Sequence, residues 1–109
     1  MCGKIVEEKR PKFRTLYGGV SVIDVKHFTK VNGYSNYYWG WGGEDDDIFR
    51  RLQDAGFPVT KYDSNIAQYT SLRHVRQLPN KNRYKLLKTA IHRYKKEGLS
   101  TLNYTVQSI

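Results

Sequence analysis

Residues 39–47 read Trp-Gly-Trp-Gly-Gly-Glu-Asp-Asp-Asp, where aromatic rings and glycines give way to four adjacent carboxylates. Glycines let a backbone bend and approach a ligand closely, and each indole offers a flat apolar face with one N–H donor. The carboxylates precede three apolar residues that share one face of a helix: Ile48, Leu52 and Ala55. We therefore expect a shaped loop over 34–43 and a helix that begins near Glu44 or Asp45 and stops at 56–58.

The four carboxylates from Glu44 to Asp47 permit two interpretations. Acidic residues in a first helical turn are favoured by the free N–H groups and the helix dipole, by about 0.3 to 1 kcal/mol each, so the run can simply begin a helix. Adjacent carboxylates also repel, which raises the pKa of at least one and suits it to general-base work. An indole under a sugar ring, with carboxylates accepting hydrogen bonds from its hydroxyls, can hold a sugar. The tryptophans and glycines in front favour such a ligand site.

Patterns on either side predict a mixed fold. Residues 1–12 read as an irregular or extended lead-in. Further elements are expected as strands at 20–23, 59–62 and 67–72 and as helices at 24–31 and 82–96, and 102–106 alternates as a strand would. The second of these helices should bury Leu87, Ala90, Ile91 and Tyr94. Strands and helices in this order indicate an α/β fold.

The whole chain has 109 residues, with 19 Lys and Arg against 10 Asp and Glu, and a formal net charge of +9. This length allows one small domain or part of a larger one and excludes a large two-domain enzyme. No run approaches the roughly 18 to 20 apolar residues of a membrane span, and the first thirty residues lack the apolar centre of a signal peptide. Cys2 is the only cysteine, so no intramolecular disulfide is possible.

Positive charge is concentrated between Arg73 and Gly98, where nine basic residues are opposed by Glu97 alone. They are Arg73, Arg76, Lys81, Arg83, Lys85, Lys88, Arg93, Lys95 and Lys96. Such a stripe attracts polyanions such as nucleic acid, anionic lipid headgroups or a nucleotide diphosphate. A solvated helix face has the same composition, and we take that as the simpler interpretation.

The nine residues at 39–47 resemble the hallmark of the β-1,4-galactosyltransferases. The similarity continues through Tyr17-Gly18-Gly19-Val20-Ser21, Asn32-Gly33-Tyr34, Ile48-Phe49-Arg50-Arg51-Leu52, Arg73-His74, Arg83-Tyr84 and Gly98-Leu99-Ser100-Thr101-Leu102-Asn103-Tyr104. It covers roughly residues 13 to 106. Motifs of this length seldom match by accident.

The resemblance implies a GT-A-type, Rossmann-like glycosyltransferase fold, of which 13–109 would be the C-terminal, acceptor-binding portion without the nucleotide-binding half. It also implies an inverting, Mn²⁺-dependent transfer of galactose or N-acetylgalactosamine from a UDP-sugar. The acceptor would be the 4-hydroxyl of a terminal N-acetylglucosamine on a glycan, in the Golgi lumen. The family's membrane anchor is absent from this sequence, and no nucleic-acid partner is expected.

Site residues follow from the same resemblance. Asp45 would be the general base on the acceptor hydroxyl. The acceptor sugar would be held by Glu44 and Asp46, with its acetamido group in a pocket lined by Arg83, Tyr84 and Leu87. Trp41 would move with a flexible loop over the donor, Gly19 and Leu16 would lie against the nucleotide sugar, and His74 would be a metal ligand. A carboxylate within hydrogen-bond reach of an attacking hydroxyl is sufficient for inversion when a diphosphate leaves.

The chain departs from the family pattern at three points. The Asp-x-Asp motif that supplies a manganese ligand is not found before residue 13. Ser71 stands where the family usually has a methionine, which replaces a soft ligand by a hard one. Leu16 stands where galactose-preferring members generally carry tyrosine, and the smaller side chain resembles members that use UDP-N-acetylgalactosamine.

Three interpretations from different classes remain open. The first is an enzyme of this family or its acceptor-binding portion. The second is a catalytically silent form that binds a sugar or a partner protein, and affinity for metal or UDP would separate it from the first. The third is a basic nucleic-acid-binding module, which explains the net charge and leaves the carboxylates unexplained. Its signature would be steep, salt-dependent binding to any duplex.

Overall fold

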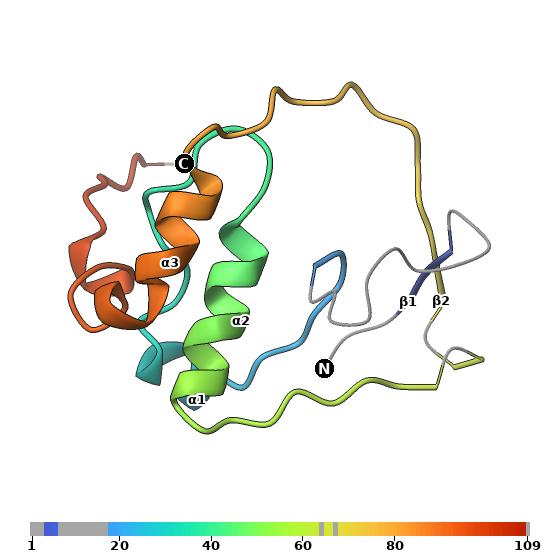
Figure 1. Cartoon of the computed structure of the whole chain (residues 1–109), viewed down its shortest axis with the longest axis horizontal. Coiled ribbons are helices and arrows are strands. Elements are labelled where there is room, and N and C mark those ends of the chain that lie inside the picture. Colours follow the sequence, from blue (N-terminus) through green and yellow to red (C-terminus); the bar gives the residue numbers. More distant parts are fainter. Residues whose placement is uncertain (1–3, 7–17, 64, 67, 109) are drawn as a thin grey trace.

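The computed structural model describes residues 4–6, 18–63, 65–66 and 68–108. Along the chain lie β1 (Lys4–Val6), α1 (Val25–Lys30), α2 (Glu44–Asp54), β2 (Gln68–Thr70), α3 (Arg83–Arg93) and a 3-10 turn, η1 (Leu99–Thr101). The helices gather at one side, and the two strands lie at the other side of an open arch (Figure 1). The mixture of helices and strands agrees with the expected α/β class. The strand β1, however, lies within the lead-in that we expected to be irregular or extended.

Helix α2 begins and ends where the sequence predicts. Gly43 precedes it with a φ of 101°, a conformation that favours glycine, and its carbonyl accepts the N–H of Asp47 at 2.9 Å. All four carboxylates lie in the first turn. At the other end Gly56 has a φ of 82°, and the N–H of Phe57 donates to the carbonyl of Leu52 at 2.9 Å.

Helix α1 also confirms the prediction made for 24–31. The side chain of Asp24 accepts a hydrogen bond from the N–H of Lys26 at 2.8 Å and so caps the helix. The helix is followed by Asn32 and Gly33, both with φ near 60° (63° and 62°). These two residues turn the chain toward the loop at 34–43, which contains no helix or strand, as expected.

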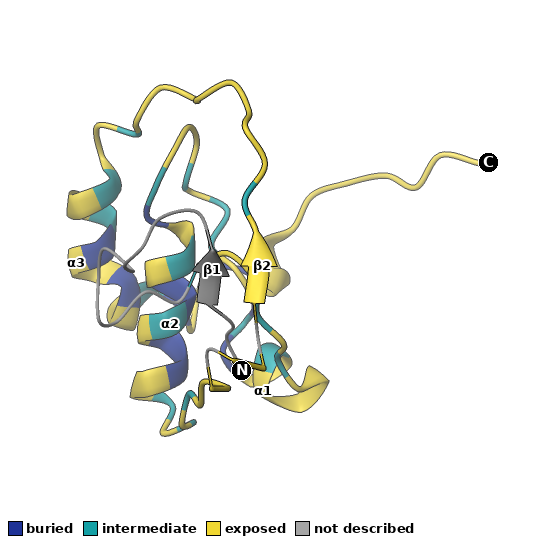
Figure 2. Ribbon diagram, turned by 90° about the vertical axis from the view of Figure 1, so that its right-hand side faces the viewer, coloured by how far each residue is buried: buried dark blue, intermediate teal, exposed yellow. Residues whose placement is uncertain are grey.

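The apolar core lies between α2, α3 and the end of α1 (Figure 2). Its buried apolar residues are Val31, Ile48, Leu52, Leu87, Ala90 and Tyr94. Burying one Val, Leu or Ile side chain stabilises a fold by about 1.5 to 3 kcal/mol. Ile91, which we expected to face inward, is 45% exposed. The buried face of α3 is centred on Leu87 and Ala90, and Ile91 lies at its edge.

A network of four charged side chains completes this core. Arg51 is fully buried and contacts Asp47 at 2.7 Å and Glu97 at 3.1 Å. Arg93 contacts the same two carboxylates at 2.8 and 2.9 Å. Two positive and two negative groups therefore neutralise one another, which buried charges require. The network ties α2, α3 and the segment after α3 into one unit.

The strand predictions are largely wrong. Strands β1 and β2 pair in parallel, with Lys4 opposite Gln68 and Val6 opposite Thr70, and β2 confirms part of the strand expected at 67–72. The described residues form no strand at 20–23, 59–62 or 102–106. A β-branched or alternating run becomes a strand only when another strand lies beside it, and the sequence pattern does not reveal that neighbour. In the described ranges, no helix is long and apolar enough to cross a membrane.

Candidate active site

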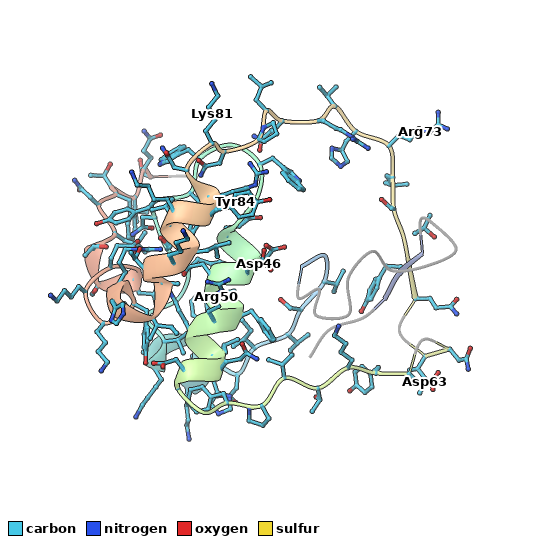
Figure 3. The ribbon with its side chains drawn as sticks, viewed as in Figure 1. Asp46, Arg50, Asp63, Arg73, Lys81 and Tyr84 are labelled. Carbon is cyan, nitrogen blue, oxygen red and sulfur yellow. The ribbon has the colours of Figure 1, made fainter. Side chains whose placement is uncertain are left out.

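The first turn of α2 divides its carboxylates between two environments. Glu44 and Asp46 are exposed and Asp45 is half-buried, whereas Asp47 is fully buried in the charge network. The Tyr38 hydroxyl donates to Asp47 at 2.6 Å. Asp46 projects from α2 on the side away from α3 (Figure 3). Three of the four carboxylates therefore remain accessible to a ligand, and these are the three that the resemblance implies.

Asp45 lies against Gly18, 27 residues earlier in the chain. A Cβ built on Gly18 would stand 2.0 Å from Asp45 Oδ2, so only glycine leaves room for this carboxylate. The other oxygen, Oδ1, accepts the N–H of Asp46 at 2.8 Å. The structure thus brings together two motifs that the sequence separates, the Gly18-Gly19 pair and the acidic turn, and the Asp45 carboxylate occupies the space that the missing side chain of Gly18 leaves.

Electrostatics in the turn agree with the expected repulsion. Burial, and then the negative charge of Asp45, raise the pKa of the Asp46 carboxyl above its ordinary value. The positive charge of Arg50 lowers the pKa and so opposes both effects. Asp46 is therefore the carboxyl with the raised pKa, and its desolvation contributes more to the shift than repulsion from Asp45 does.

Trp41 is held beside the start of α3. The backbone N–H of Trp41 donates to the Leu78 carbonyl, and the Trp41 carbonyl accepts the backbone N–H of Asn80, both at 2.9 Å. The guanidinium of Arg83 lies 5.7 Å from the Trp41 ring centre and 4.5 Å from that of Tyr84. Trp41, Arg83 and Tyr84 therefore form one cluster, which Gly42 and Gly43 connect directly to the acidic turn.

Two predicted residues occupy other surroundings. Leu87 is only 7% exposed and packs in the core, while its carbonyl accepts a hydrogen bond from Arg50 at 2.7 Å. Gly19 is exposed with a φ of 95°, so its backbone conformation favours glycine. Leu16 lies outside the described residues. The roles given to these three residues remain predictions.

His74 lies apart from the acidic turn. Arg73, the residue before it, is on the far arch of the chain in Figure 3, well away from Asp46. The Nδ1 of His74 is 3.1 Å from the Val75 carbonyl, an acceptor that leaves Nε2 open as a metal ligand. Within the described ranges, however, no three metal-binding side chains come together. These residues by themselves do not fit a manganese centre.

The sequence prediction overlooked the residues that support the site. It treated Asp47 as one more carboxylate, assigned no role to Gly18, Tyr38 or Arg51, and placed Arg93 in a basic stripe interpreted as a solvated helix face, whereas Arg93 pairs with Asp47 and Glu97. A usable signal was present, because Asp47 and Arg51, and likewise Arg93 and Glu97, are four residues apart and meet on one helix face. The contact between Gly18 and Asp45 left no such signal, since it joins distant segments.

Known proteins resemble this chain over most of its length. Residues 6–75 match a family described as "N-terminal domain of galactosyltransferase". The chain is 40% identical over 95 residues to Beta-1,4-galactosyltransferase 5 of Danio rerio and to Beta-1,4-galactosyltransferase 6 of Rattus norvegicus, covering 85% of the chain and 25% of each relative. It is 35% identical over 103 residues to Beta-1,4-galactosyltransferase 2 of Cricetulus griseus, covering 92% of the chain and 28% of the relative.

The chain thus spans about a quarter of the length of these relatives. The name of the matching family refers to an N-terminal domain, whereas the motifs led us to expect the C-terminal, acceptor-binding portion. Which portion of the relatives the chain corresponds to remains a prediction.

Proposed function

Because the chain belongs to the β-1,4-galactosyltransferase family, we propose that it provides the acceptor side of an inverting hexosyltransferase site. The donor would be a UDP-sugar and the acceptor the 4-hydroxyl of a terminal N-acetylglucosamine on a glycan. The observation that supports this most strongly is the position of Asp45. One of its oxygens accepts the Asp46 N–H and the other lies beside Gly18, directly after the loop that carries Trp41.

In this proposal Asp45 is the general base. The carboxylate takes the proton of the acceptor hydroxyl while the hydroxyl oxygen bonds to the anomeric carbon of the donor. The bond from that carbon to the UDP oxygen breaks at the same time, and UDP leaves with the electron pair. Attack opposite to the leaving group inverts the configuration of the sugar. A carboxylate held in one place avoids the entropy that a freely rotating side chain would lose.

Neighbouring residues would hold the acceptor. Glu44 and Asp46 are exposed carboxylates on either side of the base and can accept hydrogen bonds from sugar hydroxyls. Tyr84 is exposed, and Arg83 covers its ring, so the two present both an apolar surface and N–H donors to an acetamido group. Leu87 supports this surface from within the core rather than from the solvent side.

The donor side is proposed from fewer contacts. Trp41 would cover the sugar and Gly19 would allow the nucleotide sugar to approach the backbone. Manganese, when bound, stabilises negative charge on a leaving diphosphate, and His74 would contribute one ligand. Since the described residues do not form a manganese centre, no step above uses the metal. We further propose a Golgi lumen location, on the family resemblance alone.

Transfer assays with two donors test this function. The chain is incubated with Mn²⁺, N-acetylglucosamine and either UDP-galactose or UDP-N-acetylgalactosamine, and the disaccharide product is measured. We expect transfer, with N-acetylgalactosamine preferred because Leu16 leaves space for its acetamido group. The Leu16→Tyr variant should shift the preference toward galactose. If the folded chain binds N-acetylglucosamine but transfers neither sugar, then either transfer requires the nucleotide-binding half or the chain is a silent, sugar-binding form.

A further inference from the structure

A pocket lies between the loop at 34–43 and the start of α3, and we call it the Trp39 pocket. It has a volume of about 460 Å³ and is open to solvent. The residues around it are Tyr37, Trp39, Asn80, Asn82, Lys85, Leu86 and Thr89. None of these residues belongs to the candidate active site. The loop forms one wall and α3 the other, on a face of α3 that Arg83, Leu87 and Ala90 do not share.

The two aromatic side chains of this pocket differ in how they are held. Trp39 is 81% exposed, so its indole faces are available for stacking. Tyr37 is backed by the guanidinium of Arg93, 5.4 Å from the ring centre, and is thereby attached to the charge network of the core. An exposed indole next to a fixed phenol ring provides a flat apolar surface of the kind that sugar rings and bases stack on.

Several polar groups around the pocket have no partner among the described residues, although the Thr89 hydroxyl hydrogen-bonds to the Leu86 carbonyl and to Arg93. Asn82 precedes α3 but its side chain does not cap the helix. Among the described residues, no hydrogen bond or ion pair involves the side chains of Asn82, Lys85 or Trp39. Asn80 uses its side-chain oxygen to accept the Asn82 N–H at 2.9 Å, which leaves its NH₂ group as a donor. A ligand would therefore meet several free donors next to an aromatic surface.

Charge distinguishes this pocket from the acidic turn. Lys85 is its one charged lining residue, and it lies between Lys81 and Lys88, which follow the same basic stripe. Amide donors and a lysine next to an indole suit a sugar that carries a carboxylate or sulfate group. The Trp39 pocket and the candidate active site are also adjacent. Gly40 alone separates Trp39 from Trp41, and Asn80 lines the pocket while its backbone N–H donates to the Trp41 carbonyl.

We propose that the Trp39 pocket binds an acidic sugar unit of the acceptor glycan, with the ring stacked on Trp39 and its negative charge beside Lys85. This proposal rests on the proposed transfer function, because it takes the ligand to be an extension of the same acceptor. The chain would then prefer glycans in which an acidic sugar is linked to the terminal N-acetylglucosamine.

Two tetrasaccharides with the same terminal sugar test the pocket. Chitotetraose consists of neutral N-acetylglucosamine units, whereas a hyaluronan tetrasaccharide ending in N-acetylglucosamine alternates that sugar with glucuronic acid. The chain contains two tryptophans, so in a Trp41→Phe variant the fluorescence reports Trp39 alone. We expect the acidic tetrasaccharide to bind about threefold to fivefold more tightly in low salt and to quench Trp39.

Matched variants separate the pocket from general basicity. Lys85→Gln should remove the preference for the acidic tetrasaccharide, and Lys95→Gln, outside the pocket on the same basic stripe, should retain it. Trp39→Ala should weaken binding of both tetrasaccharides by about threefold to tenfold. Equal affinities for the two tetrasaccharides, or a preference that survives Lys85→Gln, would contradict the proposal that the pocket binds an acidic sugar. The transfer assay with free N-acetylglucosamine does not involve the pocket, so loss of transfer with the preference intact would overturn the proposed function instead.

Discussion

Asp45 and Asp47 are two residues apart in one helical turn, and their surroundings give them different tasks. Asp47 is fully buried and accepts hydrogen bonds from Tyr38, Arg51 and Arg93, so its contribution is to hold the turn in place. Asp45 is half-buried and keeps a fixed carboxylate beside Gly18. The nine-residue motif therefore contains a structural carboxylate as well as those proposed to bind and activate the acceptor.

Gly18→Ala should separate catalysis from stability. The added Cβ would stand 2.0 Å from Asp45 Oδ2, and the end of this side chain must move. A displacement of about 1 Å at a reacting group can cost about 100-fold in rate, so we expect a fall in kcat of that order with little change in the free energy of unfolding. Gly56→Ala is the control: with a φ of 82° and open space around it, it should cost about 1 kcal/mol of stability and leave kcat unchanged. Normal transfer by Gly18→Ala would contradict the role of this contact.

Asp46→Asn should stabilise the fold in a pH-dependent manner. The pKa of the Asp46 carboxyl is raised by burial and by Asp45, so the native state holds this proton more firmly than the unfolded chain does. Stability from this group is therefore present at low pH and lost as the pH rises through the raised pKa. Removing the charge should increase the free energy of unfolding at pH 7, by less than about 1 kcal/mol, and leave it unchanged at pH 3.

Urea unfolding of wild type and Asp46→Asn at the two pH values measures this difference. Asp63→Asn, which removes one carboxylate from an exposed turn, controls for the change in net charge. A variant that is less stable than wild type at pH 7 would show that Asp46 is held by favourable contacts rather than strained by repulsion. Transfer should fall in the same variant, because Asp46 is proposed to bind the acceptor.

At the scale of elements, the charge network joins α2 to α3 together with the apolar core. Arg51→Met keeps the length of the side chain but leaves the buried carboxylates of Asp47 and Glu97 with one cation instead of two. Breaking a buried pair in this way costs about 3 to 5 kcal/mol. Arg50→Met, one residue earlier, removes a single hydrogen bond to the Leu87 carbonyl and should cost about 1 kcal/mol. Equal losses of unfolding free energy for the two variants would contradict the network's role.

Helices were predictable from the sequence because their signals are local. Asp24 caps α1, Gly43 and the carboxylates begin α2, and Gly56 ends it, all within a few residues of the affected backbone. Strands were not predictable from the sequence, because a strand needs a partner strand that is distant along the chain. The run at 20–23 is rich in β-branched residues and still forms no strand, whereas β1 forms beside β2, 64 residues away.

Over the whole molecule, the candidate site was predicted in part. The nonapeptide located the acidic turn and Trp41, and the family resemblance added Arg83; the structure does bring them together. The spacing along α3 predicted that Leu87 faces the core, but the sequence alone did not reveal that Asp47 is buried, since its burial depends on how α2 and α3 pack. The radius of gyration of the chain is also larger than that of a typical folded domain of the same length. This radius is 15.2 Å, against about 13 Å for a folded chain of this size, because the arch from 59 to 79 extends away from the helices.

The most direct test of the central claim is the kinetics of Asp45→Asn with N-acetylglucosamine as acceptor. The asparagine keeps the size and hydrogen-bonding oxygen of the side chain but cannot take up the proton. We expect kcat to fall by about 10² to 10⁴-fold, while the acceptor's dissociation constant and the free energy of unfolding stay close to wild type. A variant that transfers at the wild-type rate would show that Asp45 is not the general base.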